Sequence, residues 1–149
     1  MMRVKEVMSK NPACCTANTS LQEVAQLMID RDCGEIPVIE ASKAGKGRPI
    51  GVVTDRDIVC RVVAAGKNPL AYVAETCMSE LVVTVPASAS LADVLSAMET
   101  HQVRRVPVVD ERGCCIGMIA QADLAWTGEE RDVAELVREV SRDTGSTAR

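Results

Sequence analysis

Residues 7–21 read VMSKNPACCTANTSL, and residues 77–91 read CMSELVVTVPASASL. Both stretches have a Met-Ser pair near the start and a Ser-Leu pair at the end, and corresponding residues are 70 positions apart. Further along the chain the spacing becomes 66, as between Gly51 and Gly117, because a loop in the first half is four residues longer. A register kept over so many residues indicates an internal duplication.

Each half of the duplication predicts the same succession of elements. A short strand is followed by a helix that begins after Ser20 or Ser90, each with an acidic residue three positions later, as at a helix N-terminus. Two apolar strands follow, separated by a turn, at residues 36–39 and 50–53 in the first half and at residues 106–109 and 115–119 in the second. A second helix begins near Asp55 or Gln121, so each half is a βαββα unit.

These units predict an α/β (α+β) fold, because strands that are apolar on both faces need helices to cover them. One unit has too few strands to do this alone, so we expect two repeats packed about a pseudo-twofold axis. Small molecules tend to bind in clefts of the kind that such an axis creates. The first repeat is expected at residues 4–68, with an N-terminal linker, and the second at residues 69–127. An amphipathic helix and a disordered tail are expected at residues 128–149.

The amino-acid composition argues against several classes of protein. The 149 residues include no Phe, one Trp and one Tyr, so the core must be aliphatic. The sequence has no apolar run of the ~18 residues that a membrane span requires, and its first residues do not resemble a secretion signal. The formal net charge of −4 argues against broad nucleic-acid binding. We therefore expect a cytoplasmic protein that binds neither membranes nor nucleic acid.

The seven cysteines and the single histidine, His101, do not form a chemical motif. The cysteine count is odd and C-x-x-C is absent from the sequence, which disfavours a disulfide framework or a zinc site. The favoured interpretation is that the cysteines are small apolar residues, with redox sensing as the alternative. The sequence also has no phosphate-binding loop and no Ser-His-Asp set, so we expect neither catalytic residues nor a resident metal or cofactor.

The repeated motifs resemble a tandem pair of cystathionine β-synthase (CBS) domains. The matching residues are Val7-Met8 and Cys77-Met78, Ile36-Pro37-Val38-Ile39 and Val106-Pro107-Val108-Val109, and Gly51-Val52-Val53-Thr54-Asp55-Arg56-Asp57. The resemblance covers about residues 4–127 and is strongest to small stand-alone bacterial members of the family. It implies nucleotide sensing, with an adenosine-containing ligand (AMP, ADP, ATP, S-adenosylmethionine or NAD) in a cleft between the repeats.

The resemblance also implies which residues bind this ligand. Thr54, Arg56 and Asp57 would contact ribose and phosphate. Their partners from the other repeat would be Val83, Thr84, Val103, Arg104, Arg105 and Val106. A carboxylate suits ribose hydroxyls, and arginines together with a helix N-terminus suit phosphate. Without a ligand, the same threonine and aspartate would make an ordinary capping box.

A second, weaker site is implied at the equivalent position of the other repeat. Its residues would be Thr16, Cys33, Gly34, Glu35, Ile36 and Asp123. Ala120 replaces the threonine here, and Glu35 stands where the first site has Arg105. Because a glutamate repels phosphate, this site is expected to be empty or to bind a neutral part of a ligand.

The sequence therefore predicts a regulatory module that binds an adenine nucleotide, forms a homodimer and acts on an unidentified protein effector. Two alternatives are a stress-response interaction protein with vestigial clefts and a cysteine-based redox sensor.

Overall fold

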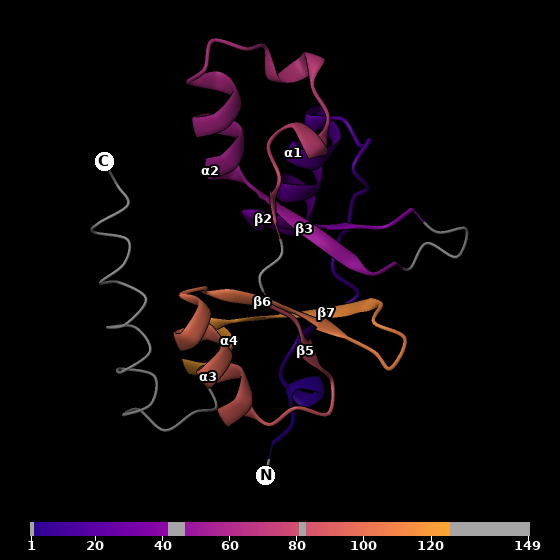
Figure 1. The fold of residues 1–149 in the computed structure, drawn as a ribbon, viewed down its shortest axis with the longest axis vertical. Helices are drawn as coiled ribbons and strands as arrows, with labels where there is room; N and C mark the ends of the chain where they lie inside the picture. The colour runs from indigo at the N-terminus through magenta and orange to yellow at the C-terminus, as the bar shows by residue number, and fades with distance from the viewer. Residues whose placement is uncertain (1, 42–46, 81–82, 126–149) are drawn as a thin grey trace. The chain divides into compact units, whose positions relative to one another are not determined.

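The computed structural model describes residues 2–41, 47–80 and 83–125 (Figure 1). The first repeat contributes α1 (Leu21–Arg31), β2 (Glu35–Ile39), β3 (Pro49–Thr54) and α2 (Asp55–Asp57). The second contributes β5 (Val85–Pro86), α3 (Leu91–His101), β6 (Arg105–Val109), β7 (Cys115–Ala120) and α4 (Gln121–Ala125). The predicted C-terminal helix and tail lie outside the described residues.

The predicted βαββα succession is confirmed in both halves. The first strand of the first repeat is reduced to Cys15, which makes a single parallel bridge with Val38. Its counterpart 70 residues later is Val85 of β5, which pairs in parallel with Val108. Val83 and Thr84, which are predicted to bind the ligand, were expected on this short strand, but they lie just before it.

Shorter elements connect these parts. They are the 3-10 turns η1 (Val4–Glu6), η3 (Pro69–Ala71) and η4 (Ala74–Thr76), the π-helical segment η2 (Ile58–Val63), and the two-residue strands β1 (Ser9–Lys10) and β4 (Ser79–Glu80). None of the helices in the described part of the chain has the length and apolar character needed to cross a bilayer.

The helix starts follow from local sequence. Ser20 accepts a hydrogen bond from the backbone of Glu23 at 3.2 Å and so caps α1. Ser90 and Asp93 form a reciprocal capping box at the start of α3, with both bonds at 3.2 Å. Both N-caps are as predicted, because the groups that form them are neighbours in the sequence.

The chain folds as two compact units, and the sheet of each unit includes a two-residue strand from the other repeat. Among the described residues, the first-repeat unit comprises residues 11–41, 47–80 and 113–115, and its sheet has the order β2-β3-β4. Within the same described part of the chain, the second-repeat unit comprises residues 2–10, 83–112 and 116–125, and its sheet has the order β1-β7-β6-β5. The strand β1, from the start of the first repeat, therefore completes the sheet of the second repeat, and β4 does the reverse.

The exchanged strands meet glycines. Lys10 of β1 lies opposite Gly117, and Glu80 of β4 lies opposite Gly51. A Cβ atom at Gly117 would run into the side chain of Met8, and one at Gly51 would lie 2.7 Å from the backbone oxygen of Ser79. In each unit, the Met-Ser pair at the exchanged strand therefore packs against the glycine in the facing strand.

Each unit has its own aliphatic core, as the composition predicts. The core of the first-repeat unit is formed by Cys15, Leu21, Val24, Ile36, Val38, Val53, Val62, Ala74 and Cys77. The core of the second-repeat unit is formed by Val4, Val85, Ala89, Val94, Met98, Val106, Val108, Ile119 and Leu124. Residues 70 positions apart, such as Val24 and Val94, occupy equivalent places in the two cores.

Candidate functional site

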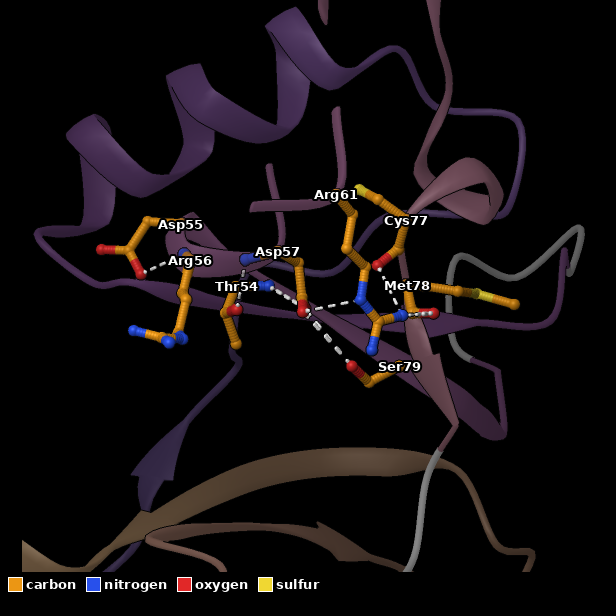
Figure 2. A network of polar contacts seen from close by, with 8 residues as sticks. All are labelled: Thr54, Asp55, Arg56, Asp57, Arg61, Cys77, Met78 and Ser79. Carbon is orange, nitrogen blue, oxygen red and sulfur yellow. Dashed lines mark hydrogen bonds and ion pairs between the residues drawn. The ribbon is translucent and has the colours of Figure 1, made fainter. Parts of the chain in front are cut away.

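The predicted ribose-binding residues lie where β3 runs into α2 (Figure 2). The backbone N–H of Asp57 donates to Thr54 Oγ1 at 3.0 Å, and the backbone N–H of Thr54 donates to Asp57 Oδ2 at 3.0 Å. This is the capping box that the sequence allowed. It holds a hydroxyl and a carboxylate side by side at the end of a strand.

Two further side chains contact the carboxylate of Asp57. Ser79 Oγ of β4 donates to it at 3.4 and 3.5 Å, and Arg61 Nε lies 3.6 Å from Oδ1. The Arg61 guanidinium also reaches the backbone oxygens of Cys77 and Met78 at 3.5 and 3.4 Å. Because a carboxylate has about four acceptor positions, these long contacts leave it able to accept from a ligand hydroxyl.

Arg56 points away from this network. Its backbone N–H donates to Asp55 Oδ1 at 2.8 Å, and its exposed side chain extends to the side opposite Arg61 (Figure 2). Among the described residues, the Arg56 guanidinium has no hydrogen bond or ion pair. Thr54 and Asp57 are partly buried whereas Arg56 is exposed, an arrangement suited to a ligand with an anionic end in solvent.

The helix that follows is unusual in geometry. After the three residues of α2 the chain continues directly as η2, whose π-helical turns hold six residues. Single π-turns within helices are rare and are frequent at functional sites. The helix N-terminus that was expected to attract phosphate is α-helical for only these three residues, and Arg56, within them, is an exposed cationic side chain close to Thr54 in the sequence.

Arg61 and Ser79 are the residues of this network that sequence reasoning missed. Arg61 is four residues after Asp57, the spacing of an ion pair along a helix. Ser79 belongs to the repeated Met-Ser pair, which was identified as a repeat but not as a contact of the aspartate. Only the pairing of β4 with β3 brings Ser79 to Asp57.

The predicted partners of Asp57 belong to the second-repeat unit. Arg104 and Arg105 are exposed where β6 begins, and the Arg104 carbonyl accepts from the backbone of Gln121 at 2.8 Å. Val83, Thr84 and Val103 are partly buried, and Val106 is in the core. Because Asp57 and the two arginines lie in different units, their convergence on one ligand stays a prediction.

The second predicted site differs from the first because it lacks the threonine hydroxyl, as the sequence indicates. Asp123 Oδ2 accepts from the backbone of Ala120 at 2.8 Å, but alanine has no hydroxyl to complete the box. In the first-repeat unit, the Gly34 carbonyl accepts from the backbone of Asp55 at 3.0 Å. The Cys33 thiol lies 3.7 Å from the Glu35 carbonyl, and Thr16 and Ile36 are in the same unit. Whether Asp123 and these residues share a ligand is likewise a prediction.

Within the described residues, no group of three or more His, Cys, Asp or Glu side chains is arranged to hold a metal ion.

Comparison with known proteins agrees with the division of the chain into two repeats. The CBS domain family matches residues 4–64 and 73–127. The chain is 32% identical to hypoxic response protein 1 of Mycobacterium tuberculosis over 140 residues, 94% of each chain. It is 38% identical to the CBS domain-containing protein YhcV of Bacillus subtilis over 125 residues, 84% of each chain.

Solved structures give the same result. A crystal structure of hypoxic response protein 1 with two coordinated zinc ions superposes with a TM-score of 0.74 at 33% identity, covering 86% of this chain and all of that one. The CBS domain pair of protein MJ0100, in complex with 5′-methylthioadenosine and S-adenosyl-L-methionine, has a TM-score of 0.71 at 25% identity, covering 85% and 94%. The predicted resemblance is confirmed: this chain belongs to the CBS domain family, as a tandem pair of CBS domains.

Proposed function

We propose that this chain is a non-catalytic regulatory module that binds an adenosine-containing ligand. The Asp57 carboxylate would accept hydrogen bonds from the ribose hydroxyls, and the Thr54 hydroxyl would accept or donate a further one. The Arg56 guanidinium would pair with a phosphate. The observation that carries it is the Thr54–Asp57 box, which presents a hydroxyl and a carboxylate next to an exposed arginine. The adenosine compounds bound by the CBS pair of MJ0100 support the choice of ligand class.

The other half of the site is part of the proposal. Arg104 and Arg105 would add charge for a phosphate, while Val83, Thr84, Val103 and Val106 would border the base. AMP, ADP, ATP, NAD and S-adenosylmethionine are the ligands to compare. The weaker site around Asp123 would be empty or would hold a neutral group, because it lacks the threonine and has Glu35 nearby.

The ligand acts by changing an equilibrium. A molecule held by both repeats stabilises one arrangement of them, and a protein effector that prefers this arrangement then binds more tightly. Coupling of this kind is typically worth about 1–3 kcal/mol. We further expect the working form to be a homodimer.

The test is calorimetric titration of the full chain with each of the five ligands and with 5′-methylthioadenosine. Asp57→Ala should weaken binding about 10- to 100-fold, because a hydrogen bond to a charged group contributes roughly 1.5–3 kcal/mol. Arg56→Ala should weaken the binding of AMP and ATP but leave that of 5′-methylthioadenosine, an adenosine compound with no anionic group, unchanged.

Two control variants separate binding from folding. Ser79→Ala removes a long contact of Asp57 but leaves the carboxylate, so it should weaken binding much less than Asp57→Ala does. Asp123→Ala removes the equivalent aspartate of the other repeat and should have a much smaller effect. If no ligand binds the unaltered chain, the clefts are vestigial and the proposal is wrong.

A further inference from the structure

The fold brings together two cysteines that are far apart in the sequence. Cys14 follows β1, and Cys115 is the first residue of β7, yet their side chains are hydrogen-bonded to each other in the first-repeat unit. The Cys14 thiol donates to the Pro12 carbonyl at 3.3 Å, so its sulfur is free to accept from the Cys115 thiol. No spacing along the chain indicates this pair.

Backbone hydrogen bonds hold Cys115 and the residue next to Cys14 in place. Next to Cys14, the Cys15 N–H donates to the Pro37 carbonyl at 3.0 Å, and the Cys15 carbonyl accepts from Ile39 at 2.8 Å. The Cys115 N–H donates to the Gly47 carbonyl at 3.0 Å. These bonds order the two segments that carry the thiols.

The two thiols differ in their access to solvent. Cys14 is partly buried and lines a surface pocket of about 320 Å3, together with Thr19, Glu23, Gln26 and Leu27. Cys115 is only 8% exposed. A small reagent that enters the pocket can therefore reach Cys14, whereas Cys115 is buried.

The contact also favours the reactive form of Cys14. The hydrogen bond from Cys115 lowers the pKa of the Cys14 thiol, against the opposing effects of burial and of neighbouring Cys15. The thiolate is the form of cysteine that attacks an oxidant, and a redox-sensitive cysteine is typically accessible and next to a second cysteine that resolves it. Cys14 and Cys115 match these two roles.

We propose that Cys14 and Cys115 are a peroxide-sensitive thiol pair that closes to an intramolecular disulfide. In the first step the Cys14 thiolate attacks one oxygen of a hydroperoxide, the O–O bond breaks, and Cys14 becomes a sulfenic acid while hydroxide or alkoxide leaves. In the second step the Cys115 sulfur attacks the Cys14 sulfur, the S–O bond breaks, and water leaves with the Cys115 proton. Two thiols lose two electrons, the peroxide gains them, and a thiol reductant reverses the change.

The test is to treat the full, reduced chain with hydrogen peroxide, quench in acid, alkylate the remaining thiols and map the bonds by mass spectrometry. Trypsin releases residues 11–31 and 113–131 as separate peptides, which the proposed disulfide would join. Because each peptide holds two adjacent cysteines, fragmentation between them must assign the bond. A bond from Cys14 to Cys115 is expected, and a bond from either peptide to any other cysteine as the main product would overturn the proposal.

Variants check the order of events. Cys14→Ser should prevent the joined peptide, and Cys115→Ser, which keeps a hydroxyl that can donate to Cys14, should leave Cys14 as a sulfenic acid that dimedone labels. Cys60→Ser is the matched control, because Cys60 is exposed on η2 and should not affect the joined peptide. If Cys60 in the unaltered chain is oxidised faster than Cys14, then exposure alone governs reactivity and the proposal is wrong; this comparison does not depend on the folding of any variant.

Discussion

Cys15 is 4% exposed and packs in the core of the first-repeat unit. Burial, with a smaller contribution from Cys77, raises the pKa of the Cys15 thiol to about 11 from an ordinary value of 9.0. Between these two values the folded chain keeps a proton that the unfolded chain has released. The free energy of unfolding should therefore fall as pH rises from about 9 to 11, by up to about 1.4 kcal/mol per pH unit, and be unaffected by this thiol below that range.

Urea unfolding under reducing conditions at a series of pH values measures this slope. Cys15→Val keeps an apolar group of similar size without a titrating proton, so its slope should be flatter. Cys60→Ala, which changes an exposed cysteine, should keep the slope of the unaltered chain. An equally steep slope in Cys15→Val would show that other groups cause it, among them Cys77, whose pKa is raised by burial and by Asp57 against the effect of Arg61.

For single residues, the sequence predicts the contacts that form between residues close together in the chain. The Thr54–Asp57 box could be predicted because both residues belong to one turn and to a repeated motif. The contact of Ser79 with Asp57 and that of Cys14 with Cys115 could not. Each depends on pairing between segments that are distant in the sequence, and the residues themselves carry no spacing that indicates it.

At the scale of elements, the exchange of β1 and β4 is the feature that the sequence did not predict. Helices α1 and α3 have caps and an apolar face that can be seen in a short window, and the longer strands are apolar runs. Strands of two residues have no periodicity, so their partners depend on the whole fold. The repeated Met-Ser pair was a sign of this exchange, but its meaning depends on Gly51 and Gly117 in the facing strands.

The two glycines should respond differently to the same substitution. Gly117→Ala and Gly51→Ala should each destabilise the chain by about 1–3 kcal/mol through overpacking. At Gly117 the nearest group is the flexible Met8 side chain, so Met8→Ala should recover part of the loss in Gly117→Ala. At Gly51 the nearest group is the Ser79 carbonyl, which Met78→Ala does not remove.

Double-mutant cycles, with stability measured by urea unfolding, give the coupling free energy between each glycine and the methionine beside it. We expect a coupling of about 1 kcal/mol between Met8 and Gly117, and a smaller one between Met78 and Gly51. Equal couplings at the two positions would contradict the view that a side chain crowds one glycine and the backbone crowds the other.

For the whole molecule, the exposed apolar side chains indicate where a second copy would bind. Val59 and Val63 on η2 are 56% and 50% exposed, Leu70 on η3 is 66% exposed, and Ile29 on α1 is 74% exposed. All four belong to helical segments of the first-repeat unit. Fully burying an exposed valine side chain contributes roughly 1.5–3 kcal/mol, and these partly exposed side chains contribute less each, so several of them together would hold two chains.

We predict that Val59→Lys and Val63→Lys weaken the homodimer on the order of 100-fold each, because each change removes apolar contact and buries a charge. Sedimentation velocity over a range of protein concentrations measures the dissociation constant. Asn18→Lys adds the same charge at an exposed polar position and should leave the constant unchanged. If both valine variants dimerise as the unaltered chain does, η2 lies outside the interface; if the unaltered chain is a monomer throughout, the homodimer itself is excluded, and regulation must then act within one chain.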